Sequence, residues 1–80
     1  MVNLWYILMT RHFSEGDKKE LYMGEWPGAF ECNSKEHALE IISIVKKRPY
    51  QLAQSEQSEP TYEPIPYSAL DAIFPNRNAS

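Results

Sequence analysis

The chain has 80 residues, of which 42% are hydrophobic and 24% charged, and its formal net charge is −3. This composition suits one small globular domain and excludes a disordered chain. No apolar run approaches the roughly 18–20 residues of a membrane span, and the apolar start lacks the basic residues of a secretory signal. A single cysteine cannot form an intrachain disulfide. This favours a reducing compartment, and we expect a cytoplasmic protein that has no membrane partner.

The acidic excess lies entirely in the C-terminal part of the chain. Residues 1–48 hold seven basic and seven acidic side chains, whereas residues 49–80 hold one basic side chain, Arg77, and four acidic ones. A non-specific nucleic-acid binder needs a basic footprint, so this distribution weakens that class of function. It permits an acidic face for a basic partner.

The first predicted element is a strand over residues 2–10, "VNLWYILMT". Both of its faces are apolar, which predicts a strand that is covered on both sides. One face carries Val2, Leu4, Tyr6 and Leu8, and the other carries Trp5, Ile7 and Met9. Residues 14–19 are predicted as a polar loop and residues 20–26 as a second strand, with Leu21 and Tyr22 on opposite faces. The two strands would form an antiparallel hairpin whose loop is too long to fix the register.

A bend at residues 27–28, "PG", precedes a segment 29–32 that can resume the strand. A helix then begins. Asn33 lies three residues before Glu36, which is the spacing of a capping box, and Ser34 is the alternative cap.

The helix has a broad apolar face and ends in basic residues followed by Pro49. Its apolar positions are Ala38, Ile41, Ile42 and Val45, widened by Leu39 and Ile44. An apolar arc this wide predicts a helix that lies on a sheet and is also covered along one flank.

The C-terminal part is predicted to hold a flexible polar loop over residues 51–60 and an edge strand over residues 61–67, because prolines cannot donate to a central ladder. Residues 68–74 resemble one or two helical turns capped by Ser68, with Leu70, Ile73 and Phe74 docked on the body. We therefore predict a single α+β domain over residues 1–75, in which a hairpin packs on one helix in a ββαβ-like arrangement. Residues 76–80 are predicted as a disordered tail.

Two catalytic or metal-binding interpretations centre on Cys32 and His37. A zinc site would need these two residues, His12 and a carboxylate to converge from separate elements. A cysteine nucleophile just before a helix would have its pKa lowered, but no third residue orients a base. We favour structural roles for both residues, and we expect neither a cofactor nor a metal nor an enzymatic activity.

Two binding functions remain. Trp5, Tyr6, Tyr22 and Trp26, with nearby basic residues, could stack single-stranded bases, and this nucleic-acid function is the alternative hypothesis. The broad apolar helix face and the amphipathic tyrosines favour protein–protein contact, either with another protein or in a homodimer. The candidate partner-binding residues are Trp26, Tyr50, Glu56, Glu59, Tyr62, Glu63 and Tyr67.

The layout "WYILM … ELYMGEW … NSKEHALEIISIV … TYEPIPYSALDAIF" resembles the compact ββαβ accessory proteins of phages and mobile elements. Several of these, such as anti-CRISPR proteins and phage inhibitors of host polymerase, bind a host or defence enzyme stoichiometrically. The resemblance covers the pattern of elements along most of the chain and includes no diagnostic motif, so it transfers no functional residue. It implies a non-catalytic binding protein of the regulatory or inhibitory type.

Overall fold

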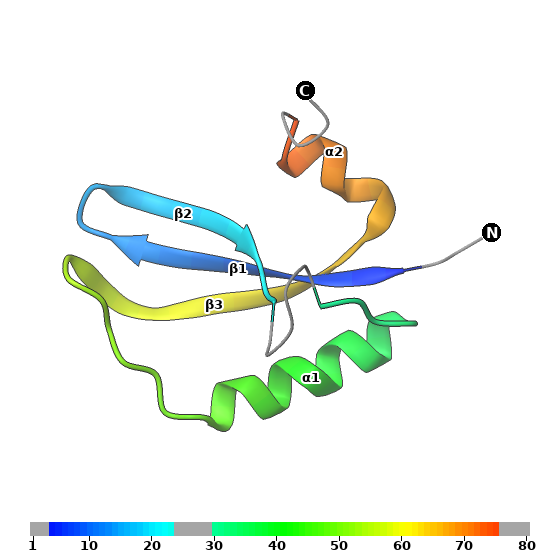
Figure 1. Ribbon diagram of the computed structural model, residues 1–80, viewed down its shortest axis with the longest axis horizontal. Helices are drawn as coiled ribbons and strands as arrows, with labels where there is room; N and C mark the ends of the chain where they lie inside the picture. Colours follow the sequence, from blue (N-terminus) through cyan, green and yellow to red (C-terminus); the bar gives the residue numbers. More distant parts are fainter. Residues whose placement is uncertain (1–3, 24–29, 76–80) are drawn as a thin grey trace.

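The computed structural model describes residues 4–23 and 30–75, and it shows a three-stranded antiparallel sheet with helical segments on both faces (Figure 1). The strand order is β2-β1-β3. The elements are β1 (Trp5–Phe13), β2 (Gly16–Leu21), α1 (Lys35–Lys47), β3 (Glu56–Pro66), the 3₁₀ turn η1 (Tyr67–Ala69) and α2 (Leu70–Ile73). This arrangement confirms the predicted α+β fold. None of the helices in these two ranges has the length and apolarity that a membrane crossing requires.

The central strand β1 is covered on both faces, as its sequence predicts. On one face Tyr6 and Leu8 are buried with Ile65 of β3 and Leu70 of α2. On the other face Ile7 is fully buried, in a cluster that Cys32, Ala38 and Ile42 complete. The sheet therefore has two small cores, one beneath α1 and one beneath α2. Val2 lies outside the described residues.

The hairpin between β1 and β2 is tighter than predicted. β1 continues to Phe13, which pairs with Gly16 across a two-residue turn, so the predicted loop over residues 14–19 was wrong. Gly16 has a φ of 137°, a conformation that glycine adopts without a Cβ clash. The distal part of the hairpin extends beyond α1 (Figure 1), and Ser14 through Lys19 are exposed. A strand that is exposed in this way carries polar side chains and resembles a loop in sequence.

Leu21 and Tyr22 do face opposite cores, as predicted. The predicted resumption of the strand is confirmed at Cys32, which exchanges two backbone hydrogen bonds of 2.8 Å with Trp5. Cys32 thereby pairs with the start of β1, at the same edge of that strand along which β2 pairs with Leu8 through Phe13. The predicted bend at residues 27–28 lies outside the described residues.

The helix α1 begins with Ser34 as its N-cap. The Ser34 hydroxyl accepts the backbone N–H of His37 at 3.0 Å, and the imidazole Nδ1 of His37 accepts the N–H of Asn33 at 3.4 Å. The predicted capping box of Asn33 and Glu36 was therefore wrong, since the reciprocal contact is made one residue later by His37. Capping explains why this histidine stands in the first turn.

The buried face of α1 is narrower than the apolar arc of its sequence. Ala38 and Ile42 are buried, whereas Leu39 and Ile44 are 47% and 45% exposed. The prediction that one flank of the helix is covered was wrong for these two positions within the described part of the chain.

β3 is longer than predicted and lies at an edge of the sheet, as predicted. Residues 56–60 belong to the strand, so the predicted polar loop is confined to residues 51–55. Two register shifts against β1 place extra residues on β3 between Glu56 and Thr61. Such bulges bend a strand and increase its twist.

After β3 the chain crosses to the other face of the sheet (Figure 1). Leu70 is buried there and Ile73 and Phe74 pack beside it, which confirms the predicted docking. The predicted cap Ser68 was wrong, because it lies inside η1 and neither η1 nor α2 has a side-chain cap.

Candidate functional site

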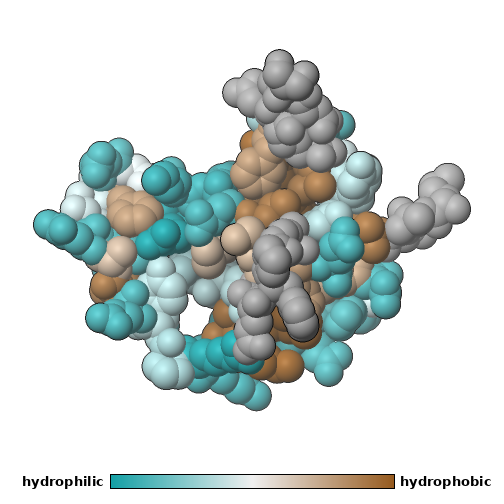
Figure 2. Space-filling model, in the orientation of Figure 1, coloured by the Kyte–Doolittle hydropathy of each residue, from teal (hydrophilic) through white to brown (hydrophobic). Residues whose placement is uncertain are grey.

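A groove of about 1060 Å³ opens between the C-terminal part of α1 and the sheet. Figure 2 shows the molecule hollowed in this region. Most of the lining side chains are apolar or aromatic, and charged side chains stand among them. The first group is Met9, Leu21, Tyr22, Met23, Val45, Pro49, Tyr50, Pro60, Tyr62 and Phe74, and the second is Lys19, Glu20, Lys46, Arg48 and Glu59.

Two tyrosines meet in the groove, Tyr22 directly after β2 and Tyr62 on β3. The rings of Tyr22 and Tyr62 are 6.3 Å apart in an edge-to-face arrangement with an interplanar angle of 87°. Met9 of β1 lies opposite Tyr62 in the register. Burial raises the pKa of Tyr62 above its ordinary value, with smaller contributions from neighbouring tyrosines and glutamates. Tyr22 and Tyr62 therefore give this part of the groove an aromatic surface.

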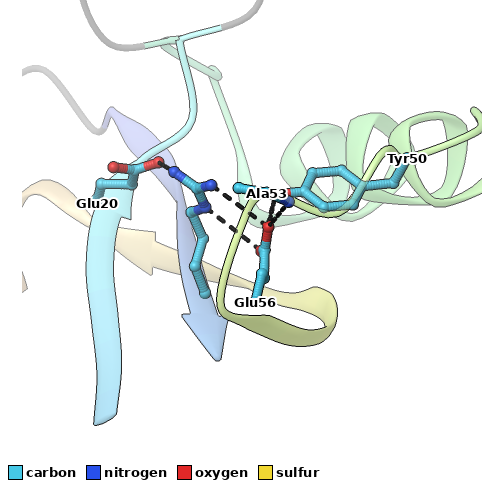
Figure 3. A network of polar contacts seen from close by, with 5 residues as sticks. Glu20, Tyr50, Ala53 and Glu56 are labelled. Carbon is cyan, nitrogen blue, oxygen red and sulfur yellow. Dashed lines mark hydrogen bonds and ion pairs between the residues drawn. The ribbon is translucent and has the colours of Figure 1, made fainter. Parts of the chain in front are cut away.

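A buried carboxylate anchors the third tyrosine (Figure 3). Glu56 has a side chain with no exposed surface. Its two oxygens accept the Tyr50 hydroxyl at 3.0 and 2.8 Å, and Oε1 accepts the Ala53 amide at 2.9 Å. Arg11 of β1 donates to the same carboxylate through Nε at 3.4 Å and Nη2 at 3.3 Å, and Nη1 lies 3.9 Å from Glu20.

Arg11 and Glu56 stabilise each other's charged forms. Burial by itself would raise the pKa of Glu56, but hydrogen bonds from the Ala53 amide, Arg11 and Tyr50 outweigh it and lower that pKa. The hydrogen bond to Glu56 raises the pKa of Arg11, and burial together with the same carboxylate raises the pKa of Tyr50. Glu56 is therefore ionised at neutral pH and is neutralised by Arg11.

This network fixes the connector between α1 and β3. Glu56 closes the turn that begins at Ala53, because its own N–H also donates to the Ala53 carbonyl at 3.0 Å. Ser55 in this turn has a φ of 73°, which is uncommon outside glycine, and its carbonyl accepts the Ser14 N–H at 2.9 Å. The connector is thus bound to the sheet, and Tyr50 is held at the groove.

The structure divides the predicted partner-binding residues into three groups. Tyr50, Glu59 and Tyr62 line the groove, and Glu56 supports it from a buried position. Glu63 faces the other side of the sheet, where it lies opposite Leu8, and the ring of Tyr67 lies beside that of Tyr6 in a tilted arrangement with centroids 6.3 Å apart. Trp26 lies outside the described residues. The bulges of β3 explain why neighbouring Glu59 and Pro60 both reach the groove.

Sequence reasoning missed the basic side of the groove. Lys46 and Arg48 were interpreted as helix-ending residues and Lys19 as part of a loop, and all three were otherwise considered only as basic residues near a nucleic-acid-binding sheet. All three line the groove, and none forms an ion pair with a carboxylate in the part of the chain that the structure describes. The signal that was available is the position of two of them at the end of the helix that forms one wall.

Cys32 does not have the environment of a nucleophile. Its side chain is fully buried, and burial raises the pKa of its thiol, whereas a position before a helix was expected to lower it. His37 accepts the Asn33 N–H at the start of α1, and His12 lies on β1, away from that helix end in the sequence. Over residues 4–23 and 30–75, no three histidine, cysteine or acidic side chains gather as metal ligands would.

A second polar cluster joins three strands on the α2 face. His12 contacts Asp17 through Nδ1 at 2.9 Å and Thr61 through Nε2 at 3.3 Å. Thr61, His12 and Asp17 thus follow one another as the hydroxyl, base and orienting acid of a catalytic triad would. Backbone N–H groups of a sheet lie in its plane, so those around Thr61 do not face its hydroxyl as an oxyanion hole would require. Cross-strand pairing is the role that this geometry supports.

Of the four aromatic residues considered for base stacking, the three that the structure describes do not form an open platform. Tyr6 is buried, Trp5 and Tyr22 pack against the core beneath α1, and Trp26 lies outside the described residues.

Comparison with known proteins adds no functional assignment: no protein-family model, curated protein or solved structure matches the chain.

Proposed function

We propose that this protein is a non-catalytic binding module that attaches to another protein through the groove. The observation that carries the proposal is the set of three tyrosines that line the groove, one of which, Tyr50, is fixed by a hydrogen bond to the buried carboxylate of Glu56. Tyrosine supplies a large amphipathic contact area at low conformational-entropy cost, and it is enriched among residues that dominate binding energy. A fixed ring loses little further freedom when a partner binds.

The mode of action that we propose is stoichiometric. A module that covers a partner's surface regulates or inhibits it without chemistry of its own. The resemblance to phage and mobile-element accessory proteins supports a host or defence enzyme as the partner, and a lone thiol suits the reducing cytoplasm.

Two neighbouring residues of α1 provide a matched test. Val45 lines the groove, whereas Ile44 is exposed and does not line it. The wild type, Val45→Gln and Ile44→Gln would each be immobilised and used to capture proteins from a nuclease-treated extract of the source organism. We expect a protein that binds the wild type and Ile44→Gln in a 1:1 complex and is lost with Val45→Gln, while circular dichroism shows all three folded.

Two outcomes would contradict the proposal. Equal capture by both variants would show that the groove is not the binding surface. Capture that occurs from a parallel untreated extract but not from the nuclease-treated one, together with a salt-dependent shift of single-stranded DNA or RNA, would establish the alternative nucleic-acid function.

A further inference from the structure

The two edges of the sheet offer different backbone surfaces. In an antiparallel strand, alternate N–H groups point to the same side. The Tyr67 N–H donates to Leu4 at 2.9 Å, so the positions of Pro64 and Pro66 face away from β1, toward the outer edge of β3. Proline has no N–H to donate, and bulges twist an edge away from partners. The β3 edge is therefore poorly suited to pairing with another strand.

The edge of β2 is open by the same criterion. The Tyr22 N–H donates to Ile7 at 2.9 Å, which directs the N–H and C=O groups of Asp17, Lys19 and Leu21 away from β1. No strand within the described ranges pairs with this edge. Each of the three positions presents one donor and one acceptor to a segment placed alongside.

The groove runs along this open edge. Its lining includes five consecutive residues, 19–23, from the end of β2 onward. Met23 is 53% exposed there, and Val45 and Phe74 add apolar surface from the two helical segments. A segment lying on the edge would thus place side chains of alternating direction against apolar walls on both faces of the sheet.

Three of the five charged side chains that line the groove are basic. Lys19, Lys46 and Arg48 line the groove, whereas the carboxylate of Glu20 lies 3.9 Å from Arg11 and Glu59 belongs to the opposite wall, on β3. This distribution favours acidic groups on whatever occupies the β2 side.

We propose that the groove accepts an extended, acidic segment of the partner protein, which adds to the open edge of β2 as a fourth strand. The inference rests on the proposed function and specifies the partner's chemistry. Backbone hydrogen bonds would supply affinity, and alternating acidic and apolar side chains would supply specificity. Since a strand rises about 3.3 Å per residue, five or six residues span the open positions.

The test begins with a library of random linear twelve-residue peptides selected against the full-length protein. We expect the selected peptides to alternate acidic and apolar residues. Hydrogen exchange measured by NMR should show fast exchange of the Lys19 and Leu21 amides in the free protein and protection of both amides in the complex. The same peptide with N-methyl groups on alternate residues should lose binding, since it lacks the backbone donors.

A matched pair of lysines tests the charge. Lys46 lines the groove and the adjacent Lys47 does not. Lys46→Glu should weaken peptide binding roughly tenfold, and Lys47→Glu should change it less than about twofold. Both positions are exposed, so both variants should fold.

Several results would overturn the inference. They are a library that yields no binder, selected peptides without acidic residues, unchanged exchange at Lys19 and Leu21 in the complex, and a free protein that dimerises with these amides already protected. The proposed function fails separately. A natural partner that is lost with Val45→Gln but leaves both amides unprotected would keep the function and reject the added strand. If acidic peptides protect the amides but the immobilised protein captures no partner, the added strand would be kept and the proposed function rejected.

Discussion

Replacing Tyr50 with phenylalanine tests whether the buried network holds the groove. The change removes the hydroxyl that donates to the Glu56 carboxylate at 3.0 and 2.8 Å and keeps the ring that lines the groove. A hydrogen bond to a charged group contributes about 1.5–3 kcal/mol. Because Arg11 and the Ala53 amide continue to bind the carboxylate, we expect the low end, a loss of about 1.5 kcal/mol in the free energy of unfolding.

The assay is thermal and urea unfolding followed by circular dichroism. For a domain of this size, each kcal/mol shifts Tm by about 4–8 °C. Tyr62→Phe is the control, since the Tyr62 hydroxyl has no hydrogen-bond partner among the described residues and should shift Tm little.

The stability difference between the wild type and Tyr50→Phe should depend on pH. The pKa of Glu56 is lower in the folded protein than its ordinary value of about 4.3. A group of this kind stabilises the fold above its unfolded pKa, and the contribution is lost as the pH falls through the folded pKa. The difference between wild type and Tyr50→Phe should therefore be full at pH 7 and shrink in acid, below about pH 4. A Tyr50→Phe protein that melts like the wild type at pH 7, or whose deficit does not change with acid, would refute the network's role.

Four further substitutions and treatments probe the rest of the fold. Ile7→Ala empties a fully buried position and should cost about 2–5 kcal/mol in urea unfolding. Ser34→Ala removes the N-cap of α1 and should cost about 1 kcal/mol by the same method. Ser55→Gly relieves a positive φ and should raise stability by up to about 1 kcal/mol, seen as a higher Tm. The buried Cys32 thiol should react with an aromatic disulfide reagent on the order of a hundredfold more slowly in the folded protein than in urea, monitored by absorbance.

The parts of the fold that were predicted from sequence are those where burial dictates residue type. β1 needs apolar residues on both faces because each face has its own core, so its pattern was unambiguous. The stripe of α1 and the docking of Leu70 were readable for the same reason.

The errors have a common physical cause. The distal hairpin and the first half of β3 lie beyond the helices, where a strand can carry polar residues and resembles a loop. The buried Glu56 stands in such a stretch, and its burial is favourable because Arg11, which is far away in the sequence, and the nearby Tyr50 and Ala53 all donate to its carboxylate. No local signal reports a contact of that range, so the groove's anchor could not be predicted from sequence. Tyr50, the tyrosine that Glu56 holds, stands among the candidate partner-binding residues, and its role in binding stays a prediction.

The central claim is that a partner protein occupies the groove, and mapping of amide chemical shifts during a titration tests it most directly. The ¹⁵N-labelled protein would be titrated with the captured partner. We predict shifts that saturate at one equivalent and concentrate at residues on both walls, such as Tyr22, Val45 and Tyr62. Shifts centred on the opposite face around Glu63, or shifts that do not saturate at 1:1, would contradict the account.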